Sequence, residues 1–530
     1  MIQTVQNTIF QFLGFVLLWQ AAFNVSNAAI TVFLKAFKYF ISLLGKAFGC
    51  TSAANVANGI PISHKTLYQR LNIDKSTHID YVVCPKCNSI YEQKDCICIH
   101  SNGSASSKTC CHIATPEHPH RSRRNACGCI LMKKQKTKHG IALTPRKVFP
   151  YRPIIKSISA LLSKPGIVDM CEQWRQRSSS HEGIEPQHLG DVYDGRIWKT
   201  FTSEEYNNFL SIPHSYLLTL NVDWFRPFVR GTTYSTGAIY LTVQNLPRHE
   251  RYRIENLILV GVLPGPSEPN LIMDSYLTPM VEELLQLWQG VMVPIQTLAG
   301  QIHIRVRAAL SCVACDIPAS RKVCGFFNHN ATLGCNKCLK KFTHTTTANG
   351  GTVTDYSGYN RENWEIRNCT SHRKQAEELK KEKTPTALEN AESKAGLRHS
   401  ILLSLPYFDP VRFTVIDPMH NLFLGTGKHS FEVWVDNGLI TKKHLTHFEE
   451  MIGKFIVPND VGRIPSSIGS GYGGFTANQW SNWITVFSPI LLKGILPDEH
   501  LRCWLMFVRA CALLRPRVIT KCDVKSADLF

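Results

Sequence analysis

The fold is decided by Ala314–Cys338, which reads ACDIPASRKVCGFFNHNATLGCNKC, and by the segment before it. Apolar and polar residues alternate along Ile302–Leu310, a pattern that predicts a β-strand. Pro318 then suits the first position of a helix. Asp316 therefore lies between a strand end and a helix start. A carboxylate in this place either caps the helix or faces an open loop where it can bind a metal ion.

A second aspartate stands in a matching position. Tyr216–Val222 predicts a buried strand that ends at Asp223. Further apolar segments predict two strands and a helix between the two aspartates: Ala238–Val243, Leu257–Val262 and Met280–Val291. This order suits an RNase H-like α/β sheet, in which an Asp on the first strand lies beside an Asp at the end of the fourth. Two such carboxylates can share divalent ions that activate a nucleophile at a phosphate. The alternative for Asp223 is a turn or cap residue.

Cysteines form a second pattern. Cys335 and Cys338 have the two-residue gap that lets two thiolates occupy adjacent corners of a zinc tetrahedron. Eight of the 19 cysteines fall between Cys84 and Cys129, interleaved with histidines, which indicates zinc in a reducing compartment rather than disulfides. We predict a zinc-binding module at residues 81–140.

The module contains more candidate ligands than one zinc ion needs. The predicted tetrahedral set is Cys84, Cys87, Cys111 and Cys127, with His118 and Cys96 as alternates. A basic arm follows or overlaps it, with Arg121, Arg123, Arg124, Lys133 and Lys134 as candidate phosphate contacts. The alternative is that the zinc site only stabilises the fold and that the basic residues form a solvated tail without a phosphate partner.

Charge and hydropathy narrow the class of protein. The formal charge of +19 favours a polyanionic partner such as nucleic acid. Residues 8–48 are strongly apolar, but Gln11 and Gln20 interrupt a first run that is shorter than a bilayer span. We therefore predict a helical N-terminal region at 1–80, docked on the rest of the protein, and no membrane partner.

Seven segments resemble the transposases of CACTA (En/Spm-type) DNA transposons. They are, in chain order, NVDWFRPF (221–228), YSTGAIY (234–240), NLP (245–247), DIPASRKVCGF (316–326), GCNKC (334–338), DPMHNLFLG (417–425) and GFTANQW (474–480). They span roughly the second half of the chain. The resemblance implies metal-dependent cleavage of transposon ends and strand transfer to target DNA, with Mg²⁺ or Mn²⁺ held by Asp223 and Asp316.

The resemblance also implies two further sites. One is a zinc site made by Cys335, Cys338, His420 and His429, with His444 and His447 as competing candidates. The other is a third acid at position 478, where this chain has Asn478 instead of the Asp of the family motif. An amide brings no charge to a metal, so either Glu449, Glu450 or Asp417 substitutes, or the chain is an inactive DNA- or protein-binding derivative.

The expected layout has five parts. The N-terminal region and the zinc module come first. An RNase H-like core is expected at 141–340, and it is followed by a helical or disordered insertion at 341–415. The rest of the core is expected at 416–530. We expect structural Zn²⁺, DNA as the partner, a homo-oligomer and a nuclear location.

Overall fold

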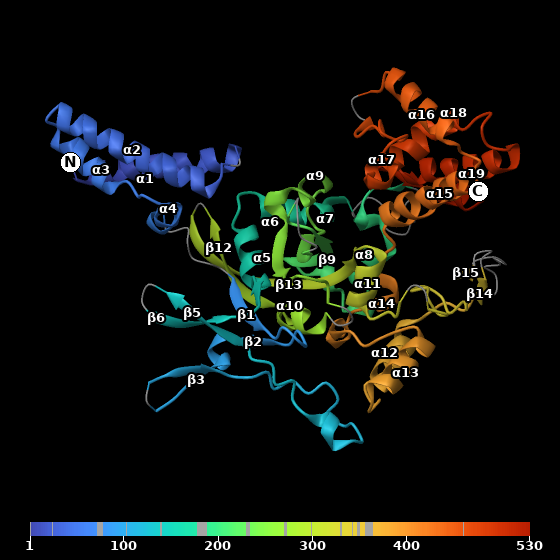
Figure 1. The fold of residues 1–530 in the computed structure, drawn as a ribbon, viewed down its shortest axis with the longest axis horizontal. Helices are drawn as coiled ribbons and strands as arrows, with labels where there is room; N and C mark the ends of the chain where they lie inside the picture. The colour runs from blue at the N-terminus through green and yellow to red at the C-terminus, as the bar shows by residue number, and fades with distance from the viewer. Residues whose placement is uncertain are drawn as a thin grey trace. The chain divides into compact units, whose positions relative to one another are not determined.

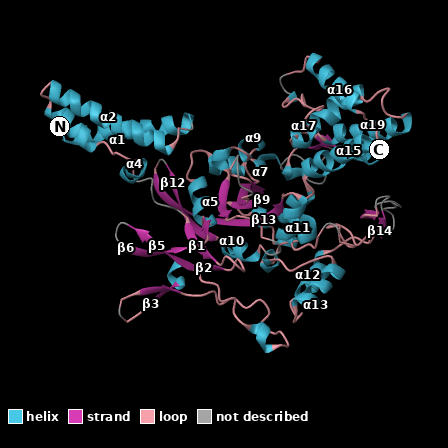
Figure 2. Ribbon diagram, viewed as in Figure 1, coloured by secondary structure: helices cyan, strands magenta, loops and turns pink. Residues whose placement is uncertain are grey.

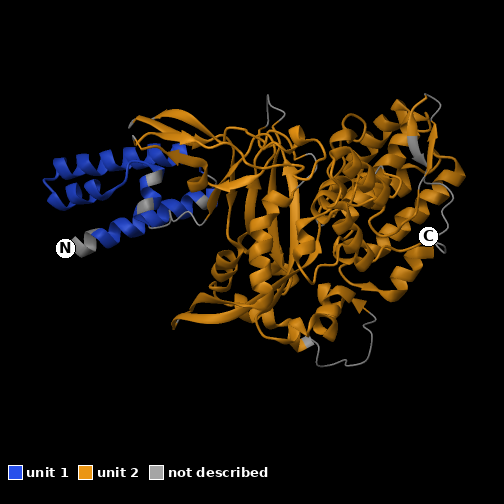
Figure 3. Cartoon of the chain, turned by 90° about the horizontal axis from the view of Figure 1, so that it is seen from below, with its two compact units in different colours: residues 1–77 blue, residues 78–530 orange. Residues whose placement is uncertain are grey.

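The structure is a computed structural model of the 530-residue chain. It describes residues 2–23, 25–71, 78–101, 103–137, 140–177, 188–228, 234–269, 273–297, 299–328, 331–341, 343–346, 350–355, 364–458 and 461–529. The chain divides into two compact units, Met1–Thr77 and His78–Phe530 (Figure 3), and each is described by itself.

The first unit is helical. Its helices are α1 (Ile2–Phe23), α2 (Asn27–Ala47), α3 (Thr51–Gly59) and α4 (His64–Arg70). The long helices α1 and α2 form a hairpin, in which Leu13 of α1 and Leu34 of α2 are buried in one cluster and Phe12 stacks on Phe37 at 4.5 Å. By length and composition α2 could cross a membrane, and only 17% of its apolar window is buried. The absence of a membrane partner therefore remains a prediction.

The second unit is built on an eight-stranded sheet (Figure 2). Its strands, in spatial order, are β12 (Val291–Thr297), β13 (Gly300–Val313), β9 (Ser215–Phe225), β10 (Thr236–Val243), β11 (Ile258–Leu263), β7 (Val148–Tyr151), β1 (Ile79–Val83) and β2 (Ile90–Glu92). All neighbouring pairs are antiparallel except β13 and β9, which are parallel. The fold is therefore mixed α/β, as the sequence predicts at this coarse level.

The central strands are nearly continuous apolar runs because both faces of the sheet are covered. In β10 seven of the eight residues are buried, and β9 is buried from Ser215 to Leu218. Helices α5 (Ile154–Leu162) and α10 (Asp274–Gln289) lie against the sheet and contribute to the same core. The helix predicted at Met280–Val291 corresponds to α10, which begins before Met280 and ends before Val291. Gly290 adopts φ 99° there, and Val291 already belongs to β12.

The cysteine-rich segment is continuous with this sheet. Strands β1, β2 and β7 belong to the sheet itself, while two short hairpins project from it. These are β3 (Ile97–Ile99) with β4 (Ala105–Ser107), and β5 (Met132–Thr137) with β6 (Gly140–Pro145). The predicted zinc module at 81–140 and the core thus lie in one compact unit.

Helices dominate the rest of the chain (Figure 1). The predicted insertion contains the hairpin β14 (Thr343–Thr346) and β15 (Thr352–Asp355), followed by α12 (Cys369–Leu379), α13 (Pro385–Ala395) and α14 (Pro410–Phe413). The C-terminal helical group contains a π-helical segment (Met419–Gly427), α15 (Lys428–Asp436), α16 (Lys442–Lys454), α17 (Ala477–Asn482) and α19 (Asp498–Leu514). This group has its own core, which includes Trp480, Trp483 and Trp504.

Candidate functional site

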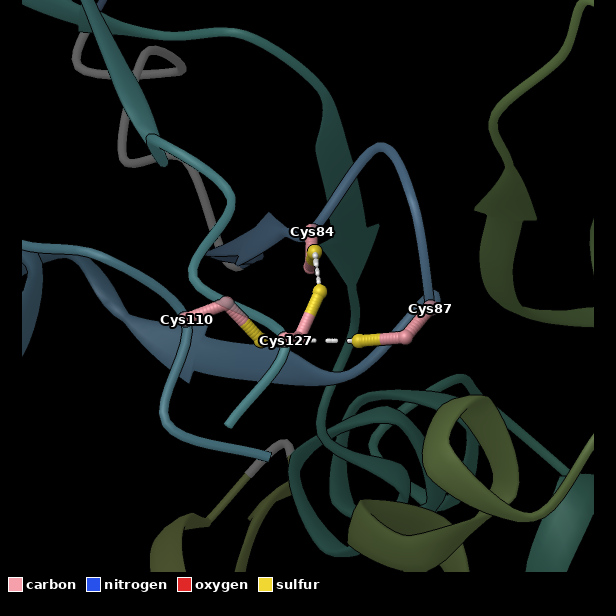
Figure 4. Close-up of side chains that lie close together, drawn as sticks. All are labelled: Cys84, Cys87, Cys110 and Cys127. Atoms are coloured by element: carbon pink, nitrogen blue, oxygen red, sulfur yellow. Dashed lines mark hydrogen bonds between the residues drawn. The ribbon is translucent and has the colours of Figure 1, made fainter. Parts of the chain in front are cut away.

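Four cysteines from three segments meet beside β1 (Figure 4). The Sγ atoms of Cys84, Cys87, Cys110 and Cys127 all lie within 4.8 Å of one another. Cys84 and Cys127 are 3.7 Å apart, and Cys87 and Cys110 are 3.4 Å apart. Bonds of about 2.3 Å from a tetrahedral zinc to four sulfurs require sulfur separations of about 3.8 Å. The donor set therefore fits one zinc ion.

Backbone hydrogen bonds hold the first pair of ligands. Cys84 directly follows β1, and its amide and carbonyl bond to Ser89 O and Asn88 N at 2.9 and 3.0 Å. Asn88 closes this turn with φ 60°, and its side chain accepts hydrogen bonds from Lys147 Nζ and Tyr276 Oη. Burial raises the pKa of Cys87, but hydrogen bonds with Ser89, Cys110 and Cys84 together outweigh this effect and lower it to about 7. Burial raises the pKa values of Cys84 and Cys110. A lowered thiol pKa favours the thiolate that a metal requires.

The second pair brackets a loop. Cys110 N donates to Cys129 O and Cys127 N donates to His112 O, each at 2.8 Å, so the loop between them is closed at its base. Tyr91 Oη lies 3.1 Å from Cys110 Sγ and supports this ligand from outside the cluster. Such outer contacts orient metal ligands.

Cys110, and not the expected Cys111, lies with the other three cysteines. Adjacent residues of an extended segment point to opposite sides, and Cys111 is exposed. The alternates also have other contacts, because Cys96 Sγ bonds to Glu92 O and His118 Nδ1 accepts from His120 N. Spacing alone could not separate Cys110 from Cys111, since the choice depends on the backbone direction at that point.

Of the two predicted catalytic aspartates, Asp223 lies on β9 and Asp316 follows the end of the neighbouring parallel strand β13. Val313 of β13 pairs with Leu220 of β9, and Asp316 and Asp223 each follow three residues later. Val222 N donates to Cys315 Sγ at 3.1 Å, which keeps the two segments together up to the aspartates. Both carboxylates therefore point from the same end of the sheet.

Asp316 also has the helix-capping contact that the sequence left as its alternative. Its Oδ1 accepts from Ala319 N at 2.8 Å and caps α11 (Ile317–Cys324). The hydrogen bond from Ala319 N uses Oδ1, and the Asp316 side chain is partly exposed to solvent. Asp223 is exposed on β9.

A third aspartate has the same register. Thr414 forms a parallel bridge with Val313, and Val415 N donates to Val313 O at 3.2 Å. Asp417 lies three residues beyond Thr414, as Asp316 lies three residues beyond Val313. Asp417 Oδ1 accepts from Met419 N at 2.9 Å, and its Oδ2 pairs with His420 Nδ1. The bridge between residues 313 and 414 is the signal that selects this aspartate, and it is not visible in the sequence.

Asn478 belongs to the C-terminal helical group. Its Oδ1 accepts from Arg463 N at 3.1 Å and lies 3.4 Å from Asn482 Nδ2. Figure 1 draws its helix, α17, among the C-terminal helices and apart from α11. Asn478 therefore contributes to local structure in this group.

The expected Cys2His2 site is not assembled in this structure. Within the described residues, only Cys84, Cys87, Cys110 and Cys127 bring three or more metal-ligating side chains together. The other predicted ligands do not meet as a set of four, because Cys335 and Cys338 contact each other and the two histidines have other surroundings. Cys335 Sγ accepts from Lys337 N, Cys338 bridges to Ile366, His420 pairs with Asp417, and His429 lies on α15.

The predicted phosphate contacts are exposed. Arg121, Arg123 and Arg124 form a short 3₁₀ turn within the loop that Cys110 and Cys127 close. Arg124 Nη2 donates to Pro119 O at 3.3 Å, and its Nε donates to His118 O at 2.5 Å. Lys133 and Lys134 are exposed on β5. The arrangement offers basic side chains to solvent near the cysteine cluster.

The comparison with protein families identifies the central part of the chain. Residues 187–393 match the transposase family tnp2. This transposase match includes Asp223, Asp316, Cys335 and Cys338, and it covers less than half of the chain. It supports a transposase-like protein, while the narrower resemblance to CACTA elements remains an expectation. A search of curated proteins found no match.

Proposed function

We propose that the protein is a DNA transposase whose divalent-metal site is formed by Asp223, Asp316 and Asp417. The observation that carries this proposal is their common register on three adjacent parallel segments, each three residues beyond a paired position. The match to a transposase family over residues 187–393 gives the class of reaction.

The strand order supports an RNase H-like core. In spatial order β11, β10 and β9 are antiparallel, and β13 follows parallel to β9. The extended segment at Thr414 then continues on the other side of β13. Parallel strands end at the same edge of a sheet, so the three aspartates share this edge. Within the described residues their carboxylates are not gathered into one ligand cluster, so metal binding would have to draw them together.

The chemistry follows from oxygen ligands at an open sheet edge. Mg²⁺ or Mn²⁺ bound there would polarise the scissile phosphate and activate a water or a 3′-hydroxyl. Asp316 would stay oriented by its bond to Ala319 N, and Asp417 by its bonds to Met419 N and His420. The four clustered cysteines would hold a structural zinc ion.

The alternative is an inactive DNA- or protein-binding derivative of a transposase. It is favoured by Asn478, which is neutral and engaged with Arg463 and Asn482 where the family motif has an acid. The two proposals differ in cleavage and agree in zinc content and DNA binding.

The test is nicking of supercoiled plasmid and strand transfer in Mn²⁺ or Mg²⁺. We expect the natural chain to cleave, and Asp316→Asn and Asp417→Asn each to lower the rate at least about a hundredfold because a metal ligand loses its charge. Asp436→Asn, on the exposed surface of α15, is the matched control and should cleave normally.

Three results would contradict the proposal. Normal cleavage by Asp417→Asn removes Asp417 from the site. Cleavage only after Asn478→Asp, and its loss in Asn478→Asp with Asp316→Asn, supports a transposase disabled at position 478. A folded, DNA-binding chain that cleaves in neither form supports the binding-protein alternative.

A further inference from the structure

A basic cavity lies beside the middle of β13, away from Asp316, which follows the end of this strand. It has a volume of about 660 Å³, and its lining includes Asn207, His214, Trp288, Gln289, Arg305 and Arg307. Arg305 and Arg307 are two residues apart on β13 and therefore share one face of the strand. From Arg307 to the end of the strand at Val313 is about 20 Å, at 3.3 Å for each residue. The cavity is thus separate from the carboxylates.

The two guanidinium groups are fixed but not neutralised. Arg305 Nη2 donates to Gln289 O at 2.8 Å, and Arg307 Nε donates to Trp288 O at 3.3 Å. Both acceptors are neutral carbonyls, and the described residues of the lining include no carboxylate. Glu172, which contacts His214 at the rim, is already paired with Arg175. Burial, and then the charge of Arg305, lower the pKa of Arg307.

The surroundings hold this charge in place. Arg307 lies over the rings of Phe209 and Trp288, with its guanidinium carbon 4.3 and 5.7 Å from their centres. The two rings stack at 4.7 Å. A Cβ on Gly290 would come within 2.6 Å of Arg305 Nε, so the glycine leaves room for the Arg305 side chain.

The rim carries unusual backbone geometry. Within the described chain four non-glycine residues have positive φ, and three of them lie here: Asn207, Asn208 and His214, with φ between 49° and 57°. Such conformations cost free energy and concentrate at sites where ligands bind. Two like charges with no counter-ion among the described residues and a strained rim together indicate a site for an anion.

We propose that this cavity binds a phosphate group of a DNA strand, with Arg305 and Arg307 as its donors. Guanidinium groups match the geometry of phosphate oxygens, and an aromatic face beside them suits a sugar or base. The inference rests on the proposed function for the identity of the strand. It adds a DNA contact that lies about 20 Å along β13 from the end of the strand near the carboxylates.

The test is fluorescence anisotropy of a labelled 30-base-pair DNA, titrated with the full chain in EDTA at several salt concentrations. In Arg305→Gln with Arg307→Gln we expect about tenfold weaker binding at a fixed salt concentration, because two charged hydrogen bonds are lost. The slope of log K against log salt should fall by about two. Arg502→Gln with Lys493→Gln removes the same charge elsewhere and should leave the slope unchanged.

A second variant keeps both arginines. Gln289→Glu adds a carboxylate to the lining and should weaken DNA binding as the double arginine variant does. Natural affinity and slope in both folded proteins would overturn the proposal. Calorimetry with inorganic phosphate separates the sources: phosphate binding that needs the arginines, together with unchanged DNA affinity, would assign the cavity to a small phosphate compound and overturn the DNA contact.

These measurements do not depend on cleavage. Asp316→Asn should bind DNA in EDTA as the natural chain does. A natural chain that does not nick DNA, while Arg305→Gln with Arg307→Gln still weakens DNA binding, would refute the metal site and keep the cavity. Normal nicking by the natural chain, with no effect of the arginine variants on DNA binding, would keep the metal site and refute the cavity. A natural chain that binds no DNA would refute both the metal site and the cavity.

Discussion

His372 is a buried side chain whose surroundings disfavour its protonated form. Only 2% of its surface is exposed, and within the described residues neither ring nitrogen has a hydrogen-bond partner. Burial, and then the positive charges of Arg367 and Arg373, lower the pKa of His372 to about 4. The histidine is therefore neutral in the folded protein at physiological pH.

This lowered pKa predicts loss of stability in acid. In the unfolded chain the pKa of His372 is about 6.5, so between about pH 6.5 and 4 the unfolded state binds the extra proton. Stability is full above pH 6.5 and falls by up to about 1.4 kcal/mol for each pH unit through this window. In His372→Leu the melting temperature should fall less between pH 7 and 5 than in the natural chain. Equal slopes in the two proteins would contradict the assignment, and His249→Leu on the exposed surface is the control.

At the scale of elements, α10 is tied to the sheet and to the C-terminal half through its acidic side chains. Glu283 accepts hydrogen bonds from Tyr151 Oη of β7 at 2.7 Å and from Ile155 N of α5 at 2.8 Å. Asp274, at the start of α10, accepts from Ile401 N at 2.9 Å. One carboxylate thus joins three elements of the core.

Glu283→Ala should therefore destabilise the fold by about 1–3 kcal/mol, because it leaves a hydroxyl and an amide without their partner. The neighbouring Glu282 is exposed and makes a matched control, and Glu282→Ala should change the free energy of unfolding by less than about 0.5 kcal/mol. Denaturant unfolding measures both. Equal changes in the free energy of unfolding for Glu283→Ala and Glu282→Ala would show that the hydrogen bonds of Glu283 do not stabilise the fold.

At the scale of the whole molecule, the cysteine cluster is part of the large second unit. Cys84 directly follows β1, a strand of the main sheet, and Asn88 in the same turn contacts Tyr276 of α10. Metal binding free energy is folding free energy when the ligands come from separate segments. Zinc should therefore stabilise the sheet and not only the basic loop.

We predict about one zinc ion at this cluster, and a lower melting temperature after treatment with a strong chelator. Cys110→Ser should lower zinc affinity at least about tenfold and reproduce the effect of the chelator, whereas Cys111→Ser should retain zinc and stability. Metal analysis and thermal unfolding of the two variants provide the measurement. If Cys110→Ser retains zinc and Cys111→Ser loses it, then Cys111 is the ligand and Cys110 is not.

Local patterns in the sequence were enough for several features. Alternating residues predicted the strand that became β13, a continuous apolar run predicted β9, and Pro318 after Asp316 marked the start of α11. The cysteine spacing predicted a metal site that includes Cys84 and Cys87, and the structure brings four cysteines together there. These features depend on neighbours in the chain, because side-chain periodicity and turn chemistry are set within a few residues.

Only the tertiary structure decided what depends on distant pairing. The parallel bridge of Val313 with Thr414 brings Asp417 into register with Asp316, across about a hundred residues of intervening chain. The direction of the backbone at residue 110 selects Cys110 over Cys111. The packing of β13 against the end of α10 and the segment 207–214 creates the cavity around Arg305. No local pattern specifies such contacts, because the free energy that selects a strand partner comes from packing and pairing across the whole sheet.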